Sequence, residues 1–267
     1  MGADTKKLRT RIKSVDSTLH LTKAMGLVAS SKIRRATEGM NKSRQYADSL
    51  NDVIRTLSQS PECAKSPYLK KSDGDRLCLV VVAGDRGLAG GYNANIFRLV
   101  KQYDASEIIP IGKRACDRFG NSQYFAEHFT YDDAAKISEK ICSDFSEGKF
   151  DKVGIVCTKY VSIMTQEAQI KWIFPLERDT SSKSASILFE PDELTVLNTV
   201  ISEYVSGILV SCVRESFASE VAARRCAMDS AGKNAQQMID DLRLEYNRAR
   251  QGAITQEITE IVAGSGA

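Results

Sequence analysis

The chain has 267 residues, of which 42% are hydrophobic and 27% are charged, and its net charge is +3. This composition is ordinary for a soluble protein, and no uninterrupted apolar run approaches the ~20 residues that a bilayer-spanning helix needs. The first six residues lack the apolar core of a secretory signal, so we expect a cytosolic or peripheral protein.

The cysteine and histidine contents argue against a disulfide framework and a metal centre. The seven cysteines are scattered without a CxxC pair, and the two histidines, His20 and His128, are far apart in the sequence. We expect buried, reduced cysteines and neither a metal nor any other cofactor.

The two ends of the chain are free of proline and differ in charge. All five prolines lie between residues 61 and 191. Since proline in a helix interior costs ~3 kcal/mol, both ends can form long helices. Residues 1–60 hold twelve basic and five acidic residues, whereas residues 192–267 hold seven and eleven, which favours pairing of the two ends. No aromatic residues interleave the basic ones, so we expect no nucleic-acid partner.

Residues 1–60 predict a coiled-coil helix. Alternate steps of four and three residues from Leu8 to Leu57 define fifteen seam positions, of which twelve are apolar. The seam is small around Thr22, Gly26 and Ala29, so a partner helix could approach closely there. Seven basic residues lie mostly off the seam, as a solvated face or as a track that faces an acidic partner: Lys13, Lys23, Lys32, Arg34, Arg35, Lys42 and Arg44.

Residues 61–191 predict a central Rossmann-like α/β domain. Residues 61–76 are polar and hold two prolines, as in a linker, and residues 77–83 form an apolar run typical of a buried parallel strand. Alternating strands and helices indicate a mostly parallel sheet. The strand patterns cover residues 107–111, 153–158 and 168–174, and the helix patterns cover residues 93–103, 113–119 and 132–145. Residues 181–186 predict a loop.

A glycine-rich loop, residues 84–91 with the sequence GDRGLAGG, follows the first strand. Strand, glycine-rich loop and helix is the arrangement that cradles phosphates, but the spacing fits neither GxGxxG nor GxxxxGK[ST]. Tight turns and contact with a partner protein are the alternatives to phosphate binding.

Residues 192–267 predict the second coiled-coil helix, so the fold class is α/β with a long antiparallel coiled coil of the two terminal helices. Apolar residues recur at helical spacing with shifts of register. Arg224 falls on this seam, where it either snorkels to water or makes a specific contact outside the coil.

The C-terminal helix is expected to outrun its partner. Antiparallel helices of about 69 and about 54 residues leave an unpaired end on the order of 20 Å long. This end retains Ile254, Ile258, Ile261 and Val262. Because a lone helix of this length is marginal in water, we expect another protein to enclose it.

Three segments closely resemble the gamma subunit of F-type ATP synthases. They are LTKAMGLVASSK from residue 21, GDRGLAGGYN from residue 84 and YNRARQGAITQEITEIV from residue 246. The resemblance implies a non-catalytic rotor shaft, with paired terminal helices inside a head of alternating alpha and beta subunits. The central domain, with the epsilon subunit, would rest on the membrane ring of c subunits. Ion flow would turn ring and shaft and so drive ATP synthesis at the beta subunits, on the cytoplasmic face of a bacterial membrane.

Carried over position by position, the resemblance implies three groups of contact residues. Contacts with the beta subunits would come from Lys23, Met25, Arg224, Gln251 and Thr255. The tip in the apolar bearing of the head would consist of Ile254, Ile258, Ile261 and Val262, and a contact loop of unassigned partner would include Arg86, Gly87, Gly90 and Gly91. Gly26 departs from the family, which usually has a larger residue there.

Two other interpretations remain open at this point. One is a free-standing α/β enzyme that binds a nucleotide or phosphate at residues 84–91 and dimerises through its helices. Nucleotide binding by the isolated chain would favour it. The other is a coiled-coil scaffold unrelated to ATP synthesis. Co-purification with alpha and beta subunits would distinguish the rotor interpretation from these two alternatives.

Overall fold

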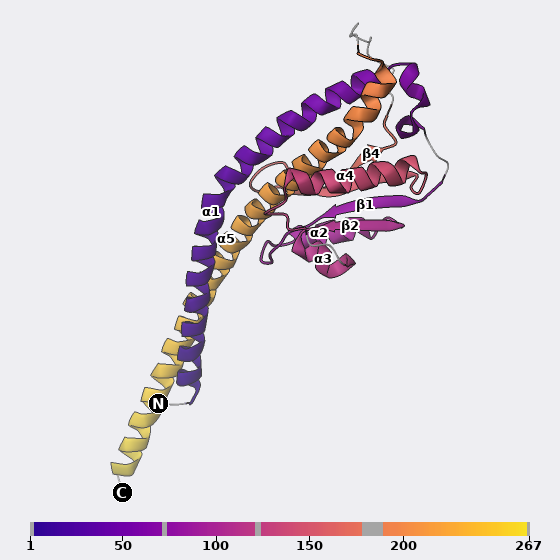
Figure 1. Cartoon of the computed structure of the whole chain (residues 1–267). Helices are drawn as coiled ribbons and strands as arrows, with labels where there is room; N and C mark the ends of the chain where they lie inside the picture. The colour runs from indigo at the N-terminus through magenta and orange to yellow at the C-terminus, as the bar shows by residue number, and fades with distance from the viewer. Residues whose placement is uncertain (1–2, 71–73, 121–123, 178–188, 266–267) are drawn as a thin grey trace. The chain divides into compact units, whose positions relative to one another are not determined.

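The computed structural model describes residues 3–70, 74–120, 124–177 and 189–265, and the loop predicted at residues 181–186 lies outside them (Figure 1). The chain divides into two compact units, Met1–Ser30 with Arg224–Ala267, and Ser31–Ala223. Two long helices, α1 (Ala3–Ser58) and α5 (Glu193–Ser265), have residues in both units.

The unit Ser31–Ala223 contains a four-stranded sheet in the order β2-β1-β3-β4. The strands are β1 (Leu77–Val82), β2 (Glu107–Ile111), β3 (Lys152–Tyr160) and β4 (Gln166–Phe174). Strand β1 pairs in parallel with β2 and β3, whereas β4 is antiparallel to β3. The short connection between β3 and β4 explains this last pairing, because only antiparallel strands can be joined by a hairpin. The predicted α/β class with a mostly parallel sheet is confirmed.

Helices cover both faces of the sheet (Figure 1). Helices α2 (Tyr92–Val100) and α3 (Lys113–Phe119) lie on one face, and α4 (Tyr131–Ser146) lies on the other. All six residues of β1 are buried, and they alternate between the two faces. This is the burial that the continuous apolar run of residues 77–83 predicts.

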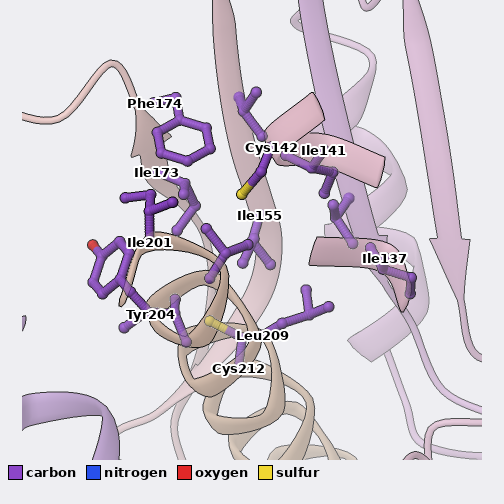
Figure 2. Close-up of a cluster of buried hydrophobic side chains, with 14 of the residues drawn as sticks. Ile137, Ile141, Cys142, Ile155, Ile173, Phe174, Ile201, Tyr204, Leu209 and Cys212 are labelled. Carbon is purple, nitrogen blue, oxygen red and sulfur yellow. The ribbon is translucent and has the colours of Figure 1, made fainter. Parts of the chain in front are cut away.

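The larger core lies on the α4 side of the sheet, where the first half of α5 also packs. Figure 2 shows Ile201 and Leu209 of α5 next to Ile155 of β3 and Phe174 of β4, all at most 1% exposed. An 18-residue window of α5 is apolar enough to cross a bilayer by length and composition, but 61% of it is buried inside the protein. The apolar character of this window is therefore that of a core helix.

The polar segment between α1 and β1 is not a loose linker, in contrast to the sequence prediction. It forms two 3-10 helices, η1 (Glu62–Lys65) and η2 (Pro67–Leu69), and Cys63 and Leu69 are buried. Tyr68 stacks on Phe174 with ring centroids 5.1 Å apart. These three apolar residues join the segment to the larger core.

The heptad seam predicted for α1 is confirmed, because none of its fifteen positions is exposed. In the first unit, Leu19 packs against Ala235 and Ile239 of α5. In the second unit, Met40 packs in one cluster with Ala218 of α5. Earlier residues of α1 thus meet later residues of α5, as in an antiparallel coiled coil.

The two helices approach closely where the α1 seam is small. A Cβ atom added to Gly232 of α5 would lie 3.6 Å from the hydroxyl oxygen of Thr22, and one added to Gly26 would lie 3.7 Å from Cβ of Met228. Small residues therefore face each other at Thr22 and Gly232.

Candidate functional site

The glycine-rich loop, residues 84–91, lies where an open α/β sheet usually binds its ligand. Strand β1 has β2 on one side and β3 on the other, so the connections from the carboxyl ends of the strands diverge at β1. In doubly wound sheets, ligands bind in the crevice at this switch point. The contents of the crevice therefore decide whether the chain could be a nucleotide-binding enzyme.

Helix α5 of the protein itself fills this crevice. The backbone N–H of Thr158, near the end of β3, donates to the hydroxyl of Ser216 at 3.0 Å, and the phenol of Tyr92 donates to the carbonyl of Ser216 at 3.0 Å. A Cβ atom on Gly84 would lie 2.7 Å from Cδ of Glu220, whose side chain is buried. Gly84 is thus required for the close approach of the buried Glu220 side chain. Burial also raises the pKa of the Tyr92 phenol above its ordinary value.

The carboxylate of Asp85 takes up the backbone donors beside the loop. It accepts hydrogen bonds from the N–H groups of Lys113 and Ala126 at 3.0 Å and of Glu127 at 2.8 Å. These are the kind of donors that an anion would need, and a phosphate could bind them only by displacing the Asp85 carboxylate. The arrangement does not support a phosphate site.

The four predicted loop residues have different environments. Arg86 is exposed, and its guanidinium lies 3.1 Å from the Glu127 carboxylate. Gly90 has φ of 57°, which supports the tight-turn interpretation, and Gly91 precedes helix α2. A Cβ atom on Gly87 would come within 3.3 Å of the Arg114 side chain, which is a close contact.

Glu127 links the loop to helix α1. Its two carboxylate oxygens have different partners, Lys32 Nζ at 2.5 Å and Arg86 Nη2 at 3.1 Å. The Glu127 side chain is only 23% exposed. The hydrogen bond from Lys32 lowers the pKa of Glu127 below its ordinary value, and the charge of Arg86 acts in the same direction.

Three of the seven basic residues on α1 that could form a track have acidic partners within the unit Ser31–Ala223, and one of them is Arg34, which lies 3.9 Å from Glu38. Lys32 binds Glu127, and Arg44 binds Glu215 of α5 at 2.7 Å. Lys13, Lys23, Arg35 and Lys42 are exposed. The exposed members leave the track interpretation open.

The residues predicted to contact beta subunits lie on both helices of the unit Met1–Ser30 with Arg224–Ala267. Lys23 is exposed, whereas Met25 and Arg224 are half-buried. Gln251 and Thr255 are exposed, and the Thr255 hydroxyl donates to the carbonyl of Gln251 at 3.0 Å.

The end of α5 is unpaired, as the sequence predicts. Helix α5 has 73 residues against 56 in α1, and every described residue from 254 to 265 is exposed. Four large apolar side chains lie in this stretch, with exposed fractions of 46% to 70%: Ile254, Ile258, Ile261 and Val262. A stretch of this kind is suited to an enclosing partner.

Within the described residues, no group of three or more His, Cys, Asp or Glu side chains could hold a metal ion. The polar groups that organise the loop, Asp85, Glu127 and Glu220, were not singled out from the sequence. Asp85 alone had a local signal, since it lies inside the glycine-rich motif.

Comparisons with known proteins agree with this geometry. The family profile described as ATP synthase matches residues 4–267. An ATP synthase gamma chain from Ruminococcus albus is 42% identical over 98% of both chains.

Solved structures of low sequence identity share the fold. One chain of the Euglena gracilis mitochondrial ATP synthase, from a structure of OSCP, F1 and c-ring, has a TM-score of 0.70 at 18% identity, with 100% of this chain and 95% of that chain covered. A rotor chain of the same enzyme has a TM-score of 0.67 at 17% identity, with coverage of 95% and 100%. A chain from the central stalk and c-ring of the Tetrahymena thermophila enzyme has a TM-score of 0.57 at 19% identity, with coverage of 79% and 99%. With the family profile and the Ruminococcus relative, the conclusion is that this chain belongs to the ATP synthase gamma chain family.

Proposed function

We infer that this chain is the non-catalytic central-stalk subunit of an F-type ATP synthase. The observation that carries this inference is helix α5, which fills the ligand crevice of its own sheet and ends in an exposed apolar stretch. Contacts of α5 occupy the usual place of a substrate, and the exposed apolar stretch is suited to an enclosing partner. ATP is made or hydrolysed by other subunits.

In the complex, the chain transmits torque between ion flow at the membrane and catalysis in the head. A two-helix coil resists bending and twisting better than a single helix does. Exposed ion pairs contribute only ~0–1 kcal/mol each, so torque comes mainly from steric push and many summed contacts. The exposed basic residues of α1 add an electrostatic interaction with the surrounding subunits, and this interaction changes as the shaft rotates.

The partners follow from the same assignment. Alpha and beta subunits surround the paired helices, with contacts to beta through Lys23, Met25, Arg224, Gln251 and Thr255. The unpaired end turns in an apolar bearing, and Arg86 with its glycine neighbours forms a further contact loop. The epsilon subunit and the c-ring bind the central domain, on the cytoplasmic face of a bacterial membrane. The 42% identical ATP synthase gamma chain of Ruminococcus albus supports the assignment to an ATP synthase complex.

Co-purification tests the assignment directly. A tagged chain, expressed in cells that make the whole complex, should elute with alpha and beta subunits. Elution of the chain alone would contradict the rotor function. Binding of ATP or inorganic phosphate to the isolated chain, measured by calorimetry, would instead favour the enzyme interpretation, which the filled crevice argues against.

Arg224 provides the residue-level test. We predict that Arg224→Ala lowers coupled ATP synthesis by about fivefold while the complex still assembles, since one contact of a charged side chain is lost. Arg98→Ala is the matched control, because Arg98 is an exposed arginine on α2, outside both terminal helices. Normal coupling in the Arg224 variant would remove this residue from the proposed contact set.

A further inference from the structure

We propose that Glu127 is a positioning residue that makes the contact loop at residues 84–91 and the part of helix α1 around Lys32 move as one body with the central domain. This inference rests on the proposed rotor function and adds a residue that the family resemblance did not supply. Its basis is the geometry of one carboxylate shared between two cations on separate elements.

Glu127 bonds in three directions. Its Oε1 atom lies 2.5 Å from Lys32 Nζ on α1, and its Oε2 atom lies 3.1 Å from Arg86 in the loop. Its backbone N–H donates to the Asp85 carboxylate at 2.8 Å. The side chain and the backbone of one residue thus hold both Arg86 and its neighbour Asp85.

The segment that carries Glu127 is itself fixed to the core. Ala126 and Phe129 are 2% and 1% exposed and belong to the larger core. The carbonyl of Phe129 also accepts a hydrogen bond from the Arg214 guanidinium of α5 at 3.2 Å. Glu127 therefore extends from a rigid base toward two exposed or half-exposed cations.

This arrangement differs from an ordinary surface ion pair. The Lys32 and Glu127 side chains are 39% and 23% exposed, whereas Arg34 and Glu38, four residues apart on α1, are 83% and 59% exposed. A shared and half-buried carboxylate restrains both cations, while an exposed pair is easily replaced by water. An arginine that must push on a partner subunit benefits from this restraint, because a free side chain would yield.

The experiment uses the assembled complex in vesicles. ATP synthesis is driven by an imposed membrane potential, with both proton and sodium gradients supplied, and ATP hydrolysis is measured on the same vesicles. The variants are Glu127→Ala, Lys32→Met and the double variant. Glu107→Ala is the matched control, because Glu107 of β2 also binds a lysine, Lys140 of α4, at 2.5 Å, and neither residue lies in the loop or in α1.

Glu127→Ala and Lys32→Met should each lower the ratio of synthesis to hydrolysis by about fivefold at normal assembly and thermal stability of the complex. The double variant should be no worse than Glu127→Ala, since Lys32 acts through this carboxylate. The control should keep the wild-type ratio. If the Glu127→Ala complex fails to assemble, the ratio of synthesis to hydrolysis in Lys32→Met decides alone. Lys32→Met removes only the link from Glu127 to α1 and leaves the link between Glu127 and Arg86 in place.

A wild-type ratio in an assembled Glu127→Ala or Lys32→Met variant would overturn the inference and leave the rotor function intact. Additive effects in the double variant, or an equal defect in Glu107→Ala, would also overturn it. A wild-type complex without coupled synthesis would overturn the rotor function and this inference with it.

Discussion

Alanine substitutions at three helix glycines should separate the effect of backbone propensity from that of helix packing. Gly26 and Gly39 lie in α1 and Gly207 lies in α5, all in helix interiors. A glycine there is ~1 kcal/mol less favourable than alanine, so any site with room for a methyl group should gain about that much stability. The structure gives each site a different amount of room.

A Cβ atom at Gly39 would have no neighbour within 4 Å, and one at Gly26 would make an ordinary contact of 3.7 Å with Met228. Both variants should therefore be ~1 kcal/mol more stable than the wild type. At Gly207 the new atom would overlap Cδ1 of Leu50 and lie 3.2 Å from the Tyr46 ring. Overpacking costs ~1–3 kcal/mol, so Gly207→Ala should lose ~1 kcal/mol after the backbone gain.

Urea unfolding of the purified chain, followed by circular dichroism at the helix band, measures these differences. Gly39→Ala is the control, because it changes the backbone alone. The expected gap between Gly39→Ala and Gly207→Ala is ~2 kcal/mol. If Gly207→Ala stabilised the chain as much as Gly39→Ala does, the helices would not approach each other at Leu50 as described. A loss of stability in Gly26→Ala would contradict the ordinary contact at Met228.

Three further predictions follow from the loop and the unpaired end. Asp85→Ala removes the acceptor of three backbone N–H groups and should cost ~2–3 kcal/mol in urea unfolding, whereas Asp85→Asn should cost less because it keeps one acceptor oxygen. Ile258→Asp should leave the stability of the isolated chain unchanged, because this side chain is 56% exposed, but should weaken binding to the alpha and beta subunits by about tenfold or more in a pull-down titration. The hydrogen bond from Lys32 lowers the pKa of Glu127 from its ordinary value of 4.5. The ionised Glu127 therefore stabilises the fold fully above pH 4.5, and this stabilisation is lost as the pH falls through the lowered pKa. Acid unfolding of Glu127→Gln should lack this component, and equal acid sensitivity of both proteins would refute it.

The helical parts of the fold were predictable because their signal is local. The alternation of four and three residues from Leu8 to Leu57 lies within one stretch of chain, and the partner helix only has to supply apolar side chains. The unpaired end followed from two lengths and the positions of the prolines. A close approach of the partner helix at Thr22 was predicted from the small seam, but its partner Gly232 was not, because the sequence does not show which residue of α5 faces Thr22.

The residues that organise the loop could not be found this way. Glu220 lies within a helix, and nothing in its neighbours shows that it will be buried beside Gly84. Glu127 likewise owes its importance to Lys32 and Arg86, which precede it by long stretches of chain. The segment before β1 was mistaken for a linker because its prolines outweighed the apolar residues Tyr68 and Leu69 in the pattern.

The charge difference between the two ends accounts for only part of the pairing of α1 with α5. It was expected to favour pairing of the helices, and the ion pair of Arg44 with Glu215 of α5 at 2.7 Å acts in this direction, whereas Lys32 binds Glu127 of the central domain. The seam itself is apolar at most positions, and burial of apolar area is the larger contribution to helix pairing. The exposed side chains of Lys13, Lys23, Arg35 and Lys42 can contact other proteins.

Helix α5 both occupies the crevice of the sheet and forms the longer helix of the shaft. Because Ser216 and Glu220 of α5 lie against the carboxyl ends of β1 and β3, the sheet is fixed directly to the helix that continues into the coil. An enzyme would keep this crevice open for its substrate and could not use the contact to carry a load. A rotor gains from closing it, since a load on the sheet then reaches α5 through buried hydrogen bonds rather than through a flexible loop. The place where doubly wound sheets usually bind a ligand is thus occupied by the contacts that join the sheet to α5.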